Sequence, residues 1–340
     1  MQLSPQDANS PVKAQTIDPI DANPLLLSLI IPIRKSYDRL AALLATFDAA
    51  SLRDLEVIVV RDHDDPPPTD FTPSADARVV VTDTVGLGHA RNFGLTYATG
   101  QFIAFCDGDD VLDLPRLLDL TRRMNDTDSD LALAAYEKIH SDGTVTQHNP
   151  SGGLRAGIII DFTDRARMSR GFYFCWNKVY RRTFLTKTAL TFPTGEYEDV
   201  FWSVLAIAQA TQILVSDQPF YGYRQVSNSA VNRAGAQHLD IVRQYSDAIA
   251  AMSDTDVPAA FALVVWTKAT RHILFVICGT NRLTAQDRAV LFDQLCQNLR
   301  SGPGLWAVAR EGDISLFNRV AILLGSFRLL EFKRMASHQR

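Results

Sequence analysis

The stretch Gln101-Phe-Ile-Ala-Phe-Cys-Asp-Gly-Asp-Asp110 places three carboxylates directly after a run of apolar residues. Such a short apolar run predicts a buried strand, and open α/β sheets bind ligands at the carboxyl ends of their strands. Carboxylates held close together raise one another's pKa, and a hard divalent cation with oxygen ligands removes that conflict. The pattern therefore indicates a site for Mg²⁺ or Mn²⁺, with a surface turn that caps the next helix as the alternative.

Strand patterns alternate with helical patterns on both sides of this stretch. The expected strands are Leu25–Ile31, which Pro32 ends, Leu55–Val60 and Arg78–Val81. The expected helices are Tyr37–Ala50, His89–Thr99 and, further along, Val200–Ala210. The turn Ser-Asp-Gly143 predicts a hairpin between Leu131–Ile139 and Thr144–Gln147. The alternation predicts a mostly parallel sheet with right-handed crossovers.

Composition limits the class of protein. The 340 residues are 46% hydrophobic, which is ample for one large domain with an accessory region, and the net charge of -4 gives no signal for nucleic acid. The four cysteines form no CxxC pair, and Cys106 and Cys175, which lie in apolar contexts, are expected to be reduced core residues, which favours a cytoplasmic protein. Residues 1–23 have no apolar signal region and are expected to be a disordered leader. No run of about 20 apolar residues is evident, so no transmembrane helix is expected.

The glycines of Gly86-Leu-Gly88-His-Ala-Arg91 suggest a dinucleotide site that the rest of the motif does not support. Arg91 stands where the third glycine of GxGxxG is needed for close packing of helix on strand, and the motif follows the third expected strand rather than the first. Neither a P-loop nor a GxSxG nucleophile motif occurs. The sequence therefore disfavours NAD binding and Ser-His-Asp hydrolysis.

A series of short motifs, in order and spacing, resembles family-2 glycosyltransferases of the GT-A fold. The motifs are Ser28-Leu-Ile-Ile-Pro32, Glu56-Val-Ile-Val-Val60 with Asp62, Gly88-His-Ala-Arg-Asn-Phe-Gly94, Phe102 to Asp110, Trp176-Asn-Lys-Val-Tyr-Arg-Arg-Thr-Phe-Leu185, Phe192-Pro193, Glu198-Asp199 and Tyr221-Gly-Tyr-Arg224. The resemblance covers roughly Leu25 to Ser229. It implies an α/β fold of the nucleotide-diphospho-sugar transferase type, with a Rossmann-like, mostly parallel sheet.

The resemblance also implies a role for each matching polar residue. At the donor site, Asp62 would contact the nucleobase, Asp107 the ribose and Asp109 the metal-bridged diphosphate, with Mg²⁺ or Mn²⁺ as the cofactor. Arg91 would support this acidic site, Asp110 matches an additional Asp of the family, and Arg224 would pair with the leaving diphosphate or with Glu198. Asp199 would be the catalytic base that activates the acceptor hydroxyl, with inversion at the anomeric carbon.

Two features of the sequence weaken parts of this assignment. Glu198 and Asp199 precede an apolar helix, where acidic residues also serve simply to complement the helix dipole. Arg34-Lys35 stands where the family often has Tyr-Asn, and Arg61 stands where it usually has a first Asp. Because both departures lie near the nucleobase pocket, a uridine donor is less secure than metal-dependent transfer.

The chain is expected to comprise the leader (1–23), a GT-A domain (24–235) and a C-terminal helical region (236–340). Helices in the last region are expected at Leu239–Met252, Ala259–Cys278, Ala285–Leu299 and Ser315–Met335. The region would bind acceptor or form a homodimer. Its last helix is apolar with four basic residues, which leaves a membrane-surface helix and a packing helix as open alternatives.

We therefore expect an inverting, metal-dependent glycosyltransferase with a nucleotide-sugar donor and a glycan or lipid-linked acceptor, in surface polysaccharide or glycoconjugate biosynthesis. The expected location is the cytoplasm, with peripheral contact to the inner face of the cell membrane. One alternative is a nucleotidyltransferase, which would want a basic glycine-rich N-terminal loop that is missing here. The other is a non-catalytic sugar-nucleotide or glycan-binding relative, against which Asp107, Asp109 and Asp199 argue.

Overall fold

The computed structural model describes residues 26–47, 53–73, 76–149, 153–171, 173–225, 234–253, 255–279, 282–312 and 314–338. The expected leader lies outside these ranges. The strands are β1 (Leu27–Ile33), β2 (Leu55–Asp62), β3 (Ala77–Thr82), β4 (Phe102–Phe105), β5 (Val111–Leu112), β6 (Leu131–Ile139), β7 (Val145–His148), β8 (Gly157–Ile159), β9 (Lys178–Arg181) and β10 (Ile213–Arg224).

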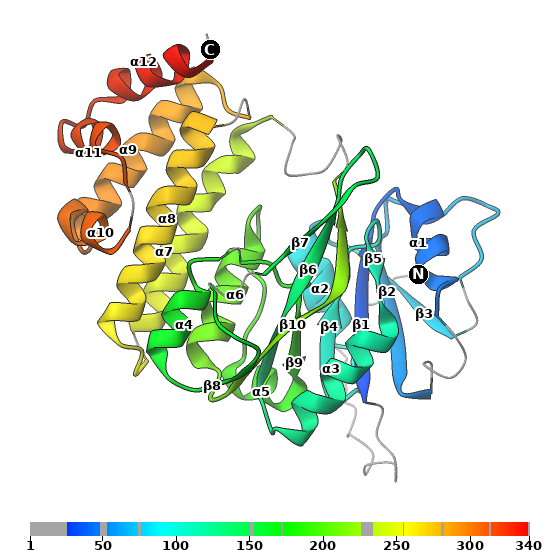
Figure 1. Cartoon of the computed structure of the whole chain (residues 1–340). Coiled ribbons are helices and arrows are strands. Elements are labelled where there is room, and N and C mark those ends of the chain that lie inside the picture. The colour runs from blue at the N-terminus through cyan, green and yellow to red at the C-terminus, as the bar shows by residue number, and fades with distance from the viewer. Residues whose placement is uncertain are drawn as a thin grey trace, which may run out of the picture.

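Helices connect these strands and then continue alone to the end of the chain. They are α1 (Tyr37–Leu44), α2 (Leu87–Leu95), α3 (Leu114–Asp126), α4 (Phe162–Met168), α5 (Arg182–Thr188), α6 (Glu198–Gln209), α7 (Asp240–Ser253), α8 (Ala259–Gly279), α9 (Ala285–Ser301), α10 (Leu305–Glu311), α11 (Leu316–Leu323) and α12 (Phe327–His338). A short 3-10 helix, Ala236–Leu239, leads into α7. In Figure 1, α7 to α12 stack beside the sheet, on the side away from α1 and β3.

One sheet of 10 strands holds the described part of the chain together, in the order β3-β2-β1-β4-β9-β6-β10-β5, with β7 on β6 and β8 on β10. The strands β3, β2, β1 and β4 run parallel, as the alternation of strands and helices predicts. Strand β9 is antiparallel to both of its neighbours, β4 and β6, so the second half of the sheet is mixed. The predicted α/β class with a mostly parallel sheet is confirmed.

Pro32 does not end the first strand, and that part of the prediction is wrong. Strand β1 continues to Ile33, and Pro32 lies opposite Val60 of β2. The pairing of β1 with β4 reaches only as far as Ile30. Pro32 therefore falls where the ladder on the β4 side has already ended, which is a position that tolerates a missing backbone N–H.

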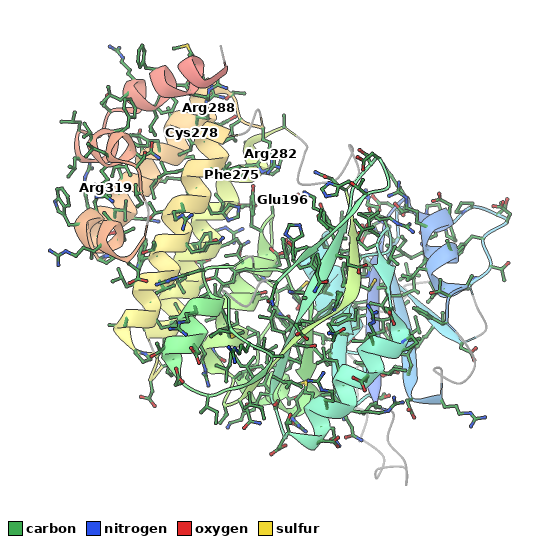
Figure 2. All side chains as sticks on the ribbon, viewed as in Figure 1. Glu196, Phe275, Cys278, Arg282, Arg288 and Arg319 are labelled. Atoms are coloured by element: carbon green, nitrogen blue, oxygen red, sulfur yellow. The ribbon has the colours of Figure 1, made fainter. Side chains whose placement is uncertain are left out.

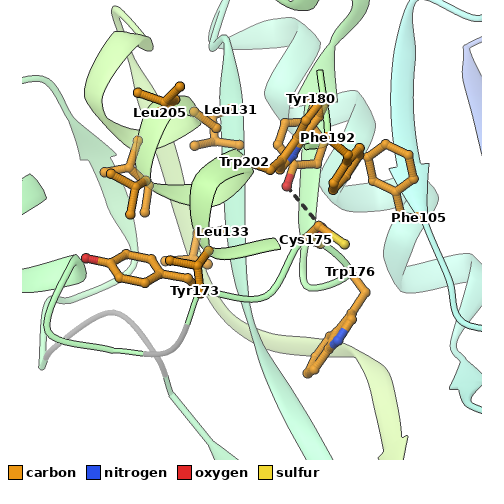
Figure 3. Packing of buried hydrophobic residues seen from close by; sticks show 14 of the residues in the cluster. Phe105, Leu131, Leu133, Tyr173, Cys175, Trp176, Tyr180, Phe192, Trp202 and Leu205 are labelled. Carbon is orange, nitrogen blue, oxygen red and sulfur yellow. Dashed lines mark hydrogen bonds between the residues drawn. The ribbon is translucent and has the colours of Figure 1, made fainter. Parts of the chain in front are cut away.

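Aromatic packing joins the sheet to the segment that enters α6 (Figure 3). The rings of Phe192 and Trp202 stack with centroids 3.9 Å apart, and Phe105 of β4 meets both rings edge-on. Tyr180 of β9 packs against the same group and donates a hydrogen bond from its hydroxyl to the carbonyl of Cys175. Buried aromatic pairs in these geometries stabilise beyond their buried area, so this cluster fixes α6 relative to β4.

The C-terminal region differs from its predicted helices in two respects. The expected single helix Ser315–Met335 is two helices, α11 and α12, and Gly325 between them has a positive φ of 58°. Helix α10 was not anticipated. Helix α8 is long and apolar enough by length and composition to cross a membrane, contrary to the expectation, but 56% of its apolar window is buried within the structure. In Figure 1 it runs between neighbouring helices as a core element of this region.

Candidate functional site

The polar residues of the predicted site gather where parallel strands end. Asp62 is the last residue of β2, and Asp107 follows β4 by two residues. Both strands pair in parallel with β1, so their carboxyl ends lie at the same edge of the sheet. This edge is the usual ligand-binding edge of an open α/β sheet.

Arg91 links an acidic residue of the sheet to one of the helix α6. Its side chain is only 2% exposed, and its Nη2 donates to Asp107 Oδ1 at 2.9 Å while its Nη1 donates to Glu198 Oε1 at 2.6 Å. The close approach needs Gly88, because a Cβ there would lie 2.8 Å from the Pro193 carbonyl oxygen and 3.0 Å from Glu198 Cγ. The glycine motif thus allows α2 to pack closely against the segment that enters α6.

Asp110 is fully engaged within the protein. It is buried, accepts a hydrogen bond of 2.6 Å from the Tyr221 hydroxyl, and accepts another of 2.7 Å from the backbone N–H of Arg224. The Tyr221 hydroxyl in turn accepts from the backbone N–H of Asp107 at 3.1 Å. Burial, followed by the charge of Asp107, raises the pKa of Asp110 well above its usual range. Asp110 therefore ties the end of β10 to the loop after β4, and each of its carboxylate oxygens already accepts a hydrogen bond within the protein.

Asp109 is the acidic residue of this loop that faces outward. Its side chain is 35% exposed, and its nearest cationic partner is Arg39 Nη1 of α1 at 3.8 Å. Burial raises the pKa of Asp109 and the charge of Asp107 adds to the effect, while the charges of Arg39 and Arg224 oppose it. The half-buried side chain of Arg224 thus lies close enough to Asp109 to act on its charge.

These residues fit a divalent cation shared with a substrate rather than a closed metal site. Within the described ranges, no group of three or more His, Cys, Asp or Glu side chains is arranged to hold a metal ion. Asp109 and the second carboxylate oxygen of Asp107 would be the ligands, because Asp110 is buried and both of its oxygens accept hydrogen bonds from Tyr221 and Arg224. Mg²⁺ is commonly held by one or two carboxylates together with substrate phosphates and water.

Asp199 and Glu198 occupy the first turn of α6 but differ in what holds them. Glu198 is buried in its ion pair with Arg91. Asp199 is half-buried, and no hydrogen bond or ion pair to another described side chain restrains its carboxyl group. Burial, the charge of Glu198 and the charge of Asp107 raise the pKa of Asp199 to about 8, while Arg91 and Lys178 oppose the rise. A carboxyl group with a pKa near neutrality is suited to proton transfer.

The residues just before α6 are fixed by the C-terminal helical region. Tyr197 is the N-cap of α6 and adopts a left-handed backbone conformation, with a φ of 61°. Its hydroxyl shares a hydrogen bond of 2.7 Å with His238 Nδ1, and the backbone N–H of Glu196 donates to Asp240 Oδ2 at 3.0 Å. Figure 2 places Glu196 at the side of the sheet that faces Arg282 and Phe275 of the helical region. A non-glycine residue with positive φ persists only where its surroundings determine it.

Further contacts from α7 strengthen this attachment. Gln244, which is fully buried, donates from Nε2 to the carbonyls of Thr194 and Glu196 at 3.0 and 3.2 Å, and Arg243 donates to the same Thr194 carbonyl at 2.7 Å. The sequence analysis did not find this attachment. Its partners lie more than 40 residues apart in the chain, and no local pattern signals such a pairing.

Asp62 lies in the predicted place but already has a partner. Arg34 Nη1 donates to Asp62 Oδ2 at 3.1 Å, and Arg34 Nη2 donates to Asp64 Oδ2 at 3.2 Å. Burial raises the pKa of Asp62, and the charge of Arg34 opposes that rise. Lys35, in a left-handed conformation, donates its backbone N–H to Asp65 at 2.8 Å. The Arg34-Lys35 departure from the family pattern thus has a structural counterpart, which is a basic residue placed across the expected nucleobase carboxylate.

Comparisons with known proteins agree with this architecture. The family model described as Glycosyl transferase family 2 matches residues 28–188. The Escherichia coli K12 protein named uncharacterized glycosyltransferase YibD is 25% identical over 64% of this chain and 67% of its own length. The poly(ribitol-phosphate) beta-glucosyltransferase of Bacillus spizizenii is 26% identical over 58% of this chain, but over only 32% of its own length.

A solved structure extends the likeness over nearly the whole chain. The structure of residues 1–349 of Staphylococcus aureus TarS in complex with UDP-GlcNAc has a TM-score of 0.71, with 19% identity, and the match covers 92% of each chain. At that identity the likeness establishes the fold, including the helices that follow the sheet. The predicted GT-A architecture with a C-terminal helical region is therefore confirmed.

Replacing Asp199 by Asn should change how stability depends on pH. A carboxyl group whose pKa is raised by folding, here to about 8, makes the wild-type protein less stable as pH increases from the unfolded-state pKa of about 4 toward 8. The variant has no carboxyl group to ionise at this position, so its stability should not decrease in this way. Between about pH 4 and pH 8 its free energy of unfolding should therefore rise relative to that of the wild type by about 1 kcal/mol or more.

Urea unfolding at about pH 5, 7 and 9 measures the difference. Asp70→Asn, at an exposed position, is the matched control and should follow the wild-type curve. Parallel wild-type and Asp199→Asn curves would mean that the carboxyl group is not perturbed.

Proposed function

Because the chain belongs to glycosyl transferase family 2, we propose that it is an inverting, metal-dependent enzyme that moves a sugar from a nucleotide-diphosphate donor to a glycan or lipid-linked acceptor. The supporting observation is that its acidic groups differ in their exposure, in their contacts and in the pKa of their carboxyl groups. Asp109 faces outward beside Arg39, whereas Asp199 is an unrestrained carboxyl group with a raised pKa. Arg91 holds the two acidic segments together through Asp107 and Glu198.

The donor side is assigned to the loop after β4. Asp109 and Asp107 would hold a divalent cation that, when bound, stabilises the charge developing on the departing diphosphate. Arg39 and Arg224 bring positive charge to the same loop and are placed to bind the diphosphate oxygens. Arg39 was absent from the residues assigned by sequence, and its contribution comes from the first turn of α1. Asp62, with Arg34, would contact the nucleobase.

The acceptor side is assigned to Asp199. As the acceptor hydroxyl attacks the anomeric carbon, its proton would pass to the Asp199 carboxylate. A positioned carboxylate contributes about 10²–10⁴-fold in such a step. Asp107 raises the pKa of Asp199, so charge neutralisation at Asp107 on donor binding would favour the ionised base. In this single displacement the acceptor oxygen would bond to the anomeric carbon from the face opposite the departing diphosphate, and the configuration at that carbon would be inverted.

The acceptor is assigned to the intermediates of surface polysaccharide or glycoconjugate biosynthesis. This assignment is consistent with a relative named for glucosyl transfer to poly(ribitol-phosphate). We place the boundary of the transferase domain near residue 235, because the sheet ends with β10 and only helices follow in the described chain. Because the helical region holds Tyr197 and Glu196 in place, we assign this region a part in forming the acceptor side.

The helical region also supports a peripheral membrane location. Helix α11 exposes Leu316, Val320, Leu323 and Leu324, whose spacing places them along one face, and their exposed fractions run from 40% to 75%. Phe332 and Met335 of α12 are exposed as well. An apolar helical face beside basic residues is typical of interfacial binding to anionic lipid.

The first prediction for this function concerns the metal. Asp109→Asn should lower transfer and Mn²⁺-dependent donor binding by about 100-fold, because it replaces a charged carboxylate ligand by a neutral amide, while the fold is retained. Thermal shifts across a panel of sugar nucleotides, with and without Mn²⁺, identify the donor first, and calorimetry then compares the variant with Asp70→Asn. Full activity of the variant, or of the wild type in excess chelator, would contradict the metal role.

The second prediction concerns the base. Asp199→Asn should lower turnover by about 10²–10⁴-fold with little change in donor affinity, because the group acts on the acceptor proton in the transition state. Single-turnover kinetics with saturating donor measure the step. Collapse of donor binding with normal turnover of the bound donor would instead make Asp199 a structural residue.

The third prediction concerns the membrane. Changing Leu316, Val320 and Leu323 together to Gln should release the protein from anionic vesicles at low salt while a soluble acceptor is still glycosylated. Substitution is preferable to truncation, because α12 carries Glu331, which pairs with buried Arg288 of α9 at 2.7 Å. The matched control is Val145→Gln with Ile160→Gln, which changes exposed apolar residues elsewhere. Failure of the wild type to bind vesicles, or self-association through this face in sedimentation, would contradict the proposal.

A further inference from the structure

A cavity lies in the helical region, apart from the donor loop. Its volume is about 340 Å³, and its walls come from α8, α10 and the residue Arg170 after α4. These elements carry none of the residues assigned to the donor or to the base. Its volume falls at the lower end of the range for small-molecule sites.

Positive charge dominates the lining of this cavity. Arg170, Lys268, Arg271 and Arg310 line it, with Glu311 as the acidic member. Glu311 is already paired with Arg170. Neither Arg271 nor Arg310 has an acidic partner among the described residues. Four cations gathered around one cavity in a chain of net charge -4 are an unusual local concentration.

Two of these cations are neighbours on the same helix. Lys268 and Arg271 lie on adjacent turns of α8, three residues apart. Burial, and then the charge of Arg271, lower the pKa of Lys268 to about 8. Like charges on neighbouring turns repel each other, and a bound phosphate would reduce this repulsion by accepting hydrogen bonds from both side chains.

We infer that this cavity is a binding site for a phosphate group, carried either by a small phosphorylated molecule or by a lipid headgroup. Arginine forks and a lysine ammonium are the side chains that recognise phosphate oxygens, and the four cations here come from α8, from α10 and from the residue Arg170 after α4. The Thr267 hydroxyl at the wall donates to the Leu263 carbonyl, so the cations supply the recognition. The inference does not depend on the proposed transfer reaction.

Binding can be tested directly on the full chain. Calorimetric titration with inorganic phosphate and with glycerol 3-phosphate, at low ionic strength and without divalent cation, should show saturable binding to the wild type. Lys268→Gln and Arg271→Gln should each weaken it by about tenfold, the loss expected for one charge-assisted hydrogen bond. Arg155→Gln removes an exposed arginine outside the cavity and should leave binding unchanged.

The source of the phosphate is distinguished by parallel measurements. Tighter binding of glycerol 3-phosphate than of inorganic phosphate, without cavity-dependent binding to phosphatidylglycerol vesicles, identifies a small phosphorylated molecule. Vesicle binding that Arg271→Gln weakens identifies a headgroup. Should a variant lose its circular dichroism signal, Arg310→Gln at the exposed end of α10 replaces it. Absence of phosphate binding by the wild type, or equal binding by the wild type and every folded variant, overturns the inference.

Discussion

The ion pairs of Arg91 are the interaction on which the candidate site depends. One guanidinium joins the loop after β4, through Asp107, to the first turn of α6, through Glu198. Removing one partner of a buried ion pair costs about 3–5 kcal/mol, because the remaining charge is left uncompensated. The same bridge engages Glu198 and leaves Asp199 beside it as the unrestrained carboxyl group, so the roles of two adjacent acidic residues differ through their contacts alone.

The three carboxyl groups in the loop after β4 differ in how many of their oxygen atoms already accept hydrogen bonds within the protein. Asp110 is satisfied by Tyr221 and the Arg224 backbone, Asp107 is half engaged, and Asp109 faces outward. Of the three, only Asp107 and Asp109 have a carboxylate oxygen that accepts no hydrogen bond from another described residue. The loop therefore contains one structural anchor, Asp110, and two carboxyl groups with an unbonded oxygen.

Sequence reasoning succeeded where the determinants are local. Apolar runs that end in Asp62 and Asp107 predicted strands of one parallel sheet, and the carboxyl ends of such strands meet by geometry. It failed where the determinants are distant. Arg39 reaches Asp109 from another helix, and Tyr197 is held by His238. The break between α11 and α12 had a local signal at Gly325, but the continuous apolar pattern around it concealed the break.

The attachment of Tyr197 and Glu196 to α7 and its preceding turn limits how this protein can be recombined. A chimera that exchanges the helical region for that of a relative, to alter acceptor choice, would remove His238, Asp240 and Gln244 together. Tyr197 would then lack the contacts that impose its left-handed conformation, and the first turn of α6 would lose its register against Arg91. The practical crossover point therefore lies after α7, so that the exchanged module begins at α8 and the parent's own contacts to the segment before α6 are preserved.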